Sequence, residues 1–308
     1  MFAVRAAIVC LAFFAVMYIM LSSLVACGWS ALGRGQRRKA LDAAGFLFGL
    51  RIFPIAVSIL FAIFLTLPSF WLMERRSFDE DGMTFLLAVC TLLLLTAGMA
   101  RVLRAAWRTR QSVTNWLRNS GSDKDASVRA MRSADGAPAV ILVGVFRPQI
   151  MVSDIAAAVL SEEELRVAIR HELGHQRSRD NLKKALINAM PFPGMSSMEA
   201  AWRQAAELAA DDEAVKDRQD ALDLASALIK LSRSSQRWPE PELASGLVCD
   251  SSAIRLRVQR LLQWREAGRS FRRSWPWATL FLLTVVGIAS NYRATLLLTH
   301  RITELLVP

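Results

Sequence analysis

The segment RHELGHQRSRD, residues 170–180, holds two of the three histidines of the chain, His171 and His175, with Glu172 between them. Residues four apart on a helix share one face, with Cβ atoms about 5–6 Å apart, so both imidazoles can bind one ion. Glu172 is rotated by about 100° from His171 and can reach a water beside that ion. The alternative, a charged helix with two chance histidines, is disfavoured because histidine is scarce here. The H-E-x-x-H spacing therefore predicts two metal ligands and a general base for metal-assisted hydrolysis.

A catalytic zinc usually has three protein ligands and one open position, so a third ligand is expected elsewhere. The remaining histidine, His300, is predicted to lie across a membrane, and Cys249 follows a Pro-rich loop without a partner motif. Better candidates are Glu207 and Asp211 in ELAADDEAV, which are again four residues apart. One carboxylate could bind the metal while the other accepts the free N–H of a ligand histidine. Glu199, about two turns earlier, is a rival ligand, and a solvated acidic face is the alternative role for Glu207.

The helix that must position the motif begins at SEEE, with Ser161 as the N-cap and Glu164 completing a capping box. Gly174 lowers helix propensity by roughly 1 kcal/mol relative to alanine, but it would let another backbone approach the site closely. Asp180 is expected to pair with a nearby Lys or Arg rather than to support the site. The PFPG segment, residues 191–194, ends the helix. The predicted apolar face consists of Leu165, Ala168, Ile169, Leu173, Leu182 and Leu186.

The sequence around the motif predicts one small hairpin among helices. The polar segment Asn119–Gly136 is expected to be a flexible linker. Two β-rich runs, Ala139–Val143 and Gln149–Val152, flank Gly144 and Pro148 and predict the hairpin. Further helices are predicted at Ser196–Arg218, Ala221–Ser232 and Ala253–Trp264.

Long uncharged runs predict that the chain crosses a membrane. Of its 308 residues, 53% are hydrophobic, and a run of about 18 or more apolar residues predicts a transmembrane helix. Four runs qualify, at approximately residues 6–32, 52–73, 83–100 and 275–292. Arg51 lies just before the second run and could extend toward the lipid headgroups. Three of the four cysteines lie in or at these runs, so a disulfide framework is not expected.

The basic residues predict the orientation in an inner (plasma) membrane. The loop ERRSFDEDG between the second and third runs has two arginines against four acids, whereas the other flanks are rich in arginine. The positive-inside rule then places this loop and both termini outside and the block between the third and fourth runs in the cytoplasm. The same clusters account for the net charge of +11, so nucleic acid binding is not expected, while contact with anionic lipid is. LVAC, ending at Cys27, resembles a lipoprotein cleavage box, but cleavage there would place the basic residues 34–39 outside.

HELGHQRSRDNL followed by ELAADDEAV resembles the integral-membrane gluzincin zinc peptidases of the β-lactam-sensor/transducer (antirepressor) type. GVFRPQIMVS before the motif, IRLRVQRLLQW after it and the four-helix arrangement extend the resemblance over most of the chain. The resemblance implies one Zn²⁺ per chain, with His171, His175 and Glu207 as ligands. It implies Glu172 as general base and Asp211 as the acid behind a ligand histidine. A strand like GVFRPQIMVS borders the cleft in gluzincins and pairs with the substrate backbone.

The expected fold class is an α-helical membrane protein with four transmembrane helices and a mainly helical α+β, zincin-like cytoplasmic domain. Residues 1–105 would hold three membrane helices, 106–273 the peptidase domain, and 274–308 the fourth helix and a short outer tail. Members of this type carry a large extracellular sensor domain after the last helix, whereas sixteen residues follow Tyr292 here. A β-lactam sensor role is therefore not expected. Sensing would fall to the membrane helices, the short loops or a separate membrane protein.

The expected function is that of a membrane zinc endopeptidase that cuts a cytoplasmic protein, which the resemblance implies to be a repressor-like regulator. The alternatives are a housekeeping or prenyl-protein-type membrane protease and a receptor whose zinc site no longer turns over. Many gluzincins hold the oxyanion with Tyr or His, but Tyr18 and Tyr292 lie in predicted membrane segments. An arginine is expected instead: Arg203 first, with Arg147 and Arg179 as other candidates.

Overall fold

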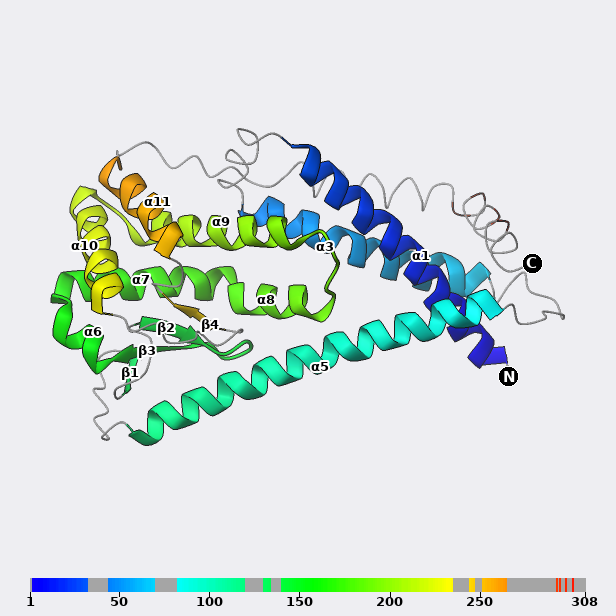
Figure 1. Ribbon diagram of the computed structural model, residues 1–308, viewed down its shortest axis with the longest axis horizontal. Coiled ribbons are helices and arrows are strands. Elements are labelled where there is room, and N and C mark those ends of the chain that lie inside the picture. The colour runs from blue at the N-terminus through cyan, green and yellow to red at the C-terminus, as the bar shows by residue number, and fades with distance from the viewer. Residues whose placement is uncertain are drawn as a thin grey trace. The chain divides into compact units, whose positions relative to one another are not determined.

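The structure, a computed structural model, describes residues 2–32, 44–69, 82–119, 130–133, 140–234, 244–246, 251–264 and the single residues 292, 294, 297 and 301. The described residues form a mainly helical fold with one small sheet (Figure 1). The chain divides into two compact units. Of the described residues, unit 1 contains those within Met1–Met99, Met190–Ala201 and Arg272–Pro308, and unit 2 those within Ala100–Ala189 and Trp202–Phe271.

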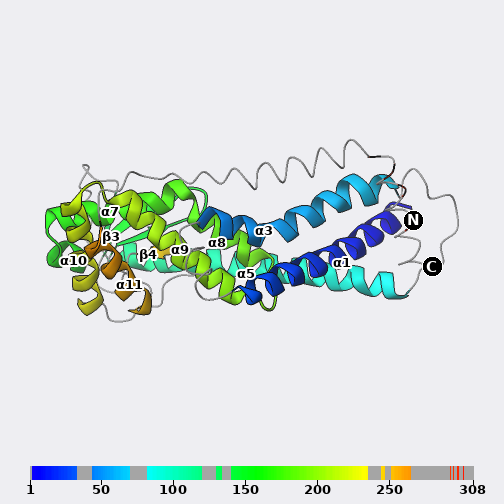
Figure 2. The same ribbon diagram turned by 90° about the horizontal axis from the view of Figure 1, so that it is seen from above.

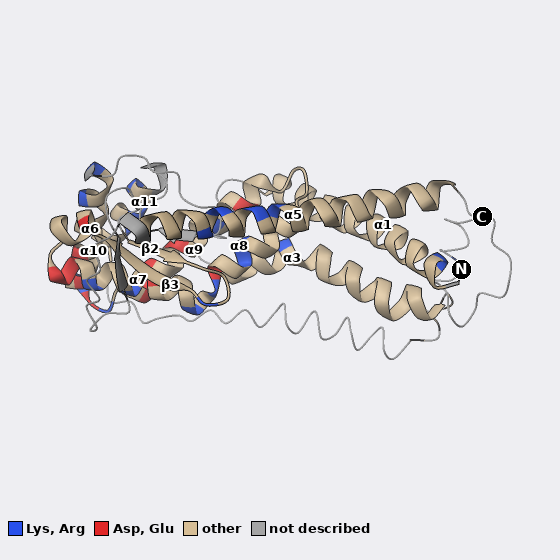
Figure 3. Cartoon of the chain, turned by 90° about the horizontal axis from the view of Figure 1, so that it is seen from below, with Lys and Arg blue, Asp and Glu red and all other residues tan. Residues whose placement is uncertain are grey.

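Unit 1 is built on apolar helices: α1 (Phe2–Ala31), α3 (Ala44–Phe61) with its π-helical continuation η1 (Ala62–Thr66), and the first part of α5 (Gly82–Asn119). Helices α1 and α3 lie side by side (Figure 2). Both are drawn almost without charged residues in Figure 3.

Within the described residues, three helices are long and apolar enough to cross a membrane, at Ala3–Ala31, Ala44–Ser69 and Gly82–Trp116. They correspond to the first three predicted spans. The fourth predicted span, 275–292, lies outside the described residues except for Tyr292.

Two of these helices extend well beyond their predicted bounds. Helix α3 begins at Ala44, so Arg51 lies about two turns inside it. Arg51 is only 1% exposed, and the expectation that it extends toward lipid headgroups is wrong. Helix α5 does not end at residue 100 but continues to Asn119, because the basic stretch after Met99 contains good helix formers and no Gly or Pro.

Unit 2 contains a four-stranded sheet of order β1-β3-β2-β4. Strands β2 (Val140–Val143) and β3 (Gln149–Ser153) pair antiparallel, which confirms the predicted hairpin. Strand β1 (Ala130–Ser133) pairs parallel with β3 inside the segment expected to be a flexible linker, so that expectation is wrong for these four residues. The short strand β4 (Ala244–Gly246) pairs with β2. Neither short sequence, AMRS or ASG, has the alternating apolar pattern that predicts a strand.

Both faces of the sheet are covered. Val140 and Leu142 of β2 point into the main hydrophobic core, whereas Ile141 and Val143 belong to a second cluster with Trp116 of α5. Successive side chains of a strand point to opposite faces, so a strand covered on both sides needs a continuous apolar run such as VILV. The remaining described helices are α6 (Asp154–Val159), α7 (Glu162–Ser178), α8 (Asp180–Ala189), α9 (Ser196–Ala214), α10 (Arg218–Ser234) and α11 (Ser251–Leu262).

The helix that carries the motif is shorter than predicted. It ends at Ser178, and Arg179 adopts a left-handed conformation with φ 55° before α8 begins. The predicted continuation of one apolar face through Leu186 is therefore wrong, and Leu186 is 44% exposed. The break redirects the chain, which allows Asp180 to reach back toward the motif.

Candidate metal centre

Local sequence fixes the start and the orientation of α7. Ser161 Oγ accepts from the Glu164 N–H at 3.2 Å, and Glu164 Oε2 accepts from the Ser161 N–H at 2.9 Å, which confirms the capping box. Ala168 lies in the main core, and Leu165, Ile169 and Leu173 pack against it. With that face committed to the core, another face of α7 is left to carry the histidines.

Gly174 brings α7 and α9 together, and the two helices run side by side in Figure 1. A Cβ atom placed on Gly174 would lie 3.3 Å from the Cα atom of Ala210 on α9. This contact is tighter than ordinary van der Waals distance, and it confirms the expectation that Gly174 admits a neighbouring backbone. Ala210 is flanked on α9 by Glu207 and Asp211, so the close approach delivers both carboxylates to the histidines.

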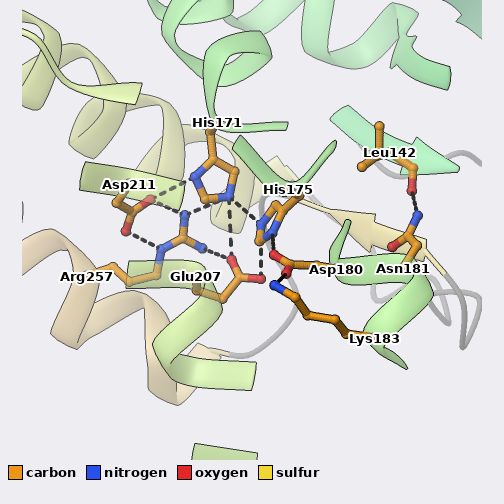
Figure 4. A network of polar contacts seen from close by, with 9 residues as sticks. All are labelled: Leu142, His171, His175, Asp180, Asn181, Lys183, Glu207, Asp211 and Arg257. Carbon is orange, nitrogen blue, oxygen red and sulfur yellow. Dashed lines mark hydrogen bonds and ion pairs between the residues drawn. The ribbon is translucent and has the colours of Figure 1, made fainter. Parts of the chain in front are cut away.

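His171, His175 and Glu207 converge on one point (Figure 4). The two histidine Nε2 atoms are 3.2 Å apart, and each lies 3.5 Å from one Glu207 oxygen. In a tetrahedral site with zinc bonds near 2.0–2.1 Å, neighbouring ligand atoms are separated by about 3.3 Å. Two imidazole nitrogens and a carboxylate at these spacings fit a zinc ion.

The opposite ring nitrogens explain why the Nε2 atoms are available. His171 Nδ1 lies 3.0 Å from Asp211 Oδ1, and His175 Nδ1 lies 2.8 Å from Asp180 Oδ2. A neutral histidine that donates its Nδ1–H to a carboxylate presents the lone pair on Nε2 to a metal. Asp180 also accepts from Lys183 Nζ at 2.8 Å, so it both pairs with a lysine, as expected, and supports the site.

Arg257 of α11 completes the polar network. Its guanidinium donates to both oxygens of Asp211 at 2.7 and 2.8 Å and to Glu207 Oε2 at 2.8 Å. In a fourth contact, Arg257 Nη2 lies 3.4 Å from His171 Nε2. The side chain is 3% exposed. It therefore orients Glu207, so that one oxygen is held by the guanidinium while the other faces His175.

The electrostatics of this cluster reflect buried opposite charges. Burial lowers the pKa of His171, but its hydrogen bonds with Asp211 and Glu207 outweigh this effect and raise that pKa to about 9. Burial raises the pKa of Glu207 and Asp211, but the nearby cations, Arg257 among them, hold both pKa values below their usual range. Without metal the two carboxylates are thus ionised and His171 is a cation at neutral pH. A metal that binds to His171 must displace one of its protons.

The predicted site residues do not all meet. Glu172 is fully buried on α7 directly after His171, while Glu199 pairs with Arg51 in unit 1 instead of joining the metal group. The three candidate oxyanion arginines, Arg203, Arg147 and Arg179, have exposed side chains. Among the described residues, the arginine that contacts the metal group is Arg257. Cys249 and His300 lie outside the described residues.

Arg257 was missed, although the sequence contains a signal for it. Ile254, Val258 and Leu261 form the inner face of α11, and Arg257 occupies the i+3 position of that same face. An arginine among inward-facing apolar positions is buried and needs an acidic partner. The adjacent acids of ELAADDEAV are that partner.

Comparison with known families agrees with this geometry. Residues 81–261 match the model of the BlaR1 peptidase M56 family, which is more than half of the chain. The chain belongs to this family. Membership, together with the three apolar helices, indicates a membrane-associated metallopeptidase. No curated protein matches the chain.

Proposed function

We propose that this family member is a zinc-dependent endopeptidase that hydrolyses peptide bonds of a cytoplasmic protein. The observation that carries the proposal is the convergence of His171, His175 and Glu207 at zinc-compatible spacing, with the buried Glu172 next to His171 in the sequence of α7. Two imidazoles and one carboxylate are the ligand set of hydrolytic zinc sites that leave one position open.

Each residue of the site has a distinct chemical role in the proposed reaction. A zinc ion held there would supply a Lewis acid that polarises a carbonyl and lowers the pKa of water. Glu172 would accept the proton of the attacking water and return it to the leaving amine. Asp211 and Asp180 keep the two ligand histidines in the required tautomer. Arg257 holds Glu207 in place, and its Nη2, 3.4 Å from His171 Nε2, is also near enough to the site to offset developing negative charge.

The cytoplasmic placement of unit 2 is part of the proposal. It is supported by arginines on the stretch of α5 that follows Met99, including Arg101, Arg104 and Arg108, because cytoplasmic flanks of membrane helices are enriched in Lys and Arg. A substrate in the same compartment, a repressor-like regulator, would then convert a membrane event into a change in the cytoplasm.

The Glu172→Gln variant tests catalysis separately from metal binding. In the full chain purified in detergent, the variant should retain zinc, because Glu172 is not a ligand, and should lose turnover by about 10²–10⁴-fold. The matched control is Glu163→Gln, an exposed glutamate on the same helix, whose turnover should stay within about twofold.

The wild type and the Glu172→Gln variant, compared in cells, can also identify the substrate. Cytoplasmic protein N-termini should be compared between cells that produce the wild type and cells that produce Glu172→Gln. A new N-terminus that is present only with the wild type identifies the target. Full cellular function with Glu172→Gln would overturn the enzyme assignment and favour a receptor that merely retains a metal site.

A further inference from the structure

A second buried arginine, Arg51 of α3, forms a polar cluster in unit 1. Its Nε donates to Glu199 Oε1 at 2.8 Å, and its Nη2 donates to the Met190 carbonyl at 2.5 Å. The same carbonyl accepts from Tyr18 Oη of α1 at 3.0 Å. Two apolar helices therefore bind one short segment of the chain.

The Arg51–Glu199 ion pair favours one position of the bound segment, because the charge of Arg51 is buried. Arg51 is 1% exposed and Glu199 17% exposed. Ionisable residues inside apolar membrane helices are rare, pair with each other and mark functional positions. Removal of one partner leaves a buried charge without compensation, which is strongly unfavourable. The pair thus specifies where the bound segment lies.

The bound segment is the connector between α8 and α9. Met190 follows the last residue of α8, and Glu199 lies in the first turn of α9. Between them, the ring of Phe192 packs edge-on against Tyr18 with centroids 5.7 Å apart. Tyr18 of α1 therefore contacts the connector at Met190 and Phe192, and Arg51 of α3 binds both the Met190 carbonyl and Glu199 at the start of α9.

Helix α9 connects this polar cluster to the metal centre. Its residues run from Ser196 to Ala214, so Glu199 and Glu207 lie on the same helix. They are eight positions apart in the chain, which is about 12 Å along a helix axis. Metal ligands must lie within about 0.2 Å of their bonding distances. A shift or rotation at Glu199 would therefore change the distance and angle at which Glu207 meets the metal.

We propose that Arg51 and Glu199 are positioning residues that couple α1 and α3 to the metal ligand Glu207. While the pair is formed, α9 holds Glu207 at bonding distance. A rearrangement of α1 and α3 that opens the pair changes the position of Glu207 at the metal and lowers activity. This inference rests on the proposed metal site. It gives the membrane helices a direct route for controlling the peptidase.

The test uses the full chain in lipid nanodiscs with Co²⁺ in place of zinc, because the visible spectrum of Co²⁺ reports the geometry of its ligands. Glu199→Gln should keep the metal and shift the Co²⁺ spectrum. It should lower kcat by about 10–100-fold, the range expected when a residue that orients a metal ligand is substituted. KM should change less than about threefold, because the substrate contacts are untouched. The double variant Arg51→Glu with Glu199→Arg should recover at least part of both losses.

Two further variants complete the design. Glu213→Gln removes an exposed ion pair with Arg177 from the same helix and should leave the spectrum and kcat unchanged. Tyr18→Phe removes a single hydrogen bond from the connector and should shift the spectrum in the same direction as Glu199→Gln, by less. Tyr18→Phe provides the second test of the coupling if the double variant Arg51→Glu with Glu199→Arg does not fold.

The outcomes separate the inference from the proposed function. A wild-type spectrum and kcat in both Glu199→Gln and Tyr18→Phe, with an active wild type, would overturn the coupling alone. A wild type that binds no stoichiometric metal, or whose turnover survives Glu172→Gln, would instead overturn the proposed function.

Discussion

Helix α9 carries two buried arginine–glutamate pairs, one in each unit of the molecule. In unit 1, Glu199 pairs with Arg51 at 2.8 Å, and in unit 2, Glu207 pairs with Arg257 at the same distance. Both glutamates are 17% exposed and both arginines 3% exposed or less. The local ion-pair chemistry of the two positions is therefore nearly identical.

The difference lies in what surrounds each glutamate. One oxygen of Glu207 is held by Arg257, while its carboxylate also faces the Nε2 atoms of His171 and His175. Glu199 has instead a neighbouring backbone carbonyl, that of Met190, bound by the same arginine. The two ion pairs are thus alike, but Glu207 also faces two imidazoles whose Nδ1 atoms are already bound to carboxylates, which is the arrangement of a metal site.

Removal of the cation from the unit 2 pair should have the largest effect of the substitutions compared here. Arg257→Gln removes the guanidinium that binds the buried Glu207 and Asp211, so the metal-free protein should lose about 3–5 kcal/mol of stability. Added zinc should restore much of that loss, because the metal supplies positive charge. Turnover should fall by about 10–100-fold even with metal bound, because Glu207 is no longer oriented. Thermal unfolding with and without zinc, and kinetics, measure both.

The control for Arg257 lies one turn further along α11. Arg260 pairs with Asp212 at 2.7 Å, so it links the same two helices, but both side chains are well exposed. Arg260→Gln should change stability and turnover little. Arg257→Lys should be intermediate, because it keeps the charge but loses the fork geometry. Equal effects of Arg257→Gln and Arg260→Gln would show that Arg257 serves only general helix packing.

A smaller effect is expected where α7 and α9 touch. In Gly174→Ala the new Cβ atom meets the Ala210 backbone at 3.3 Å, so α9 must move by a few tenths of an ångström beside Glu207. The gain in helix propensity, about 1 kcal/mol, opposes the strain, so stability should change little. Turnover should fall by up to about tenfold, because small misplacements at an active site are costly.

Gly49→Ala is the matched control, because Gly49 is also helical and a Cβ atom there would meet nothing within 4 Å. Turnover of Gly174→Ala equal to that of Gly49→Ala would mean that the close approach does not position Glu207.

The smallest effect is expected at the N-terminus of α7. Burial raises the pKa of Glu164, but bonds from Lys230, Ser226 and the Ser161 N–H outweigh it and lower the net pKa. A depressed pKa in the folded state stabilises the fold above the unfolded pKa, about 4.3, and the contribution disappears as the pH falls through the folded value. Glu164→Gln should therefore cost about 1 kcal/mol at neutral pH and little in acid, with unchanged turnover. A stability difference that grows on acidification would contradict this account.

The sequence was informative where chemistry and periodicity coincide. The capping box, the hairpin and the role of Gly174 follow from local spacing and are present in the structure. Strand β1 and the break at Arg179 were missed, because pairing with a distant strand and a left-handed residue leave no local pattern. Arg257 and the partner of Arg51 depend on contacts between segments 50 and 148 residues apart. Such partners appear only when the elements are placed in space.

The central claim is that Glu207 rather than Glu199 is the carboxylate ligand of the metal. It is tested most directly by zinc content per chain in the purified full-length wild type, Glu207→Gln and Glu199→Gln. We expect about one zinc in the wild type and in Glu199→Gln, and a small fraction of that in Glu207→Gln, because two histidines alone do not complete a zinc site. Loss of zinc from Glu199→Gln with retention in Glu207→Gln would contradict the assignment.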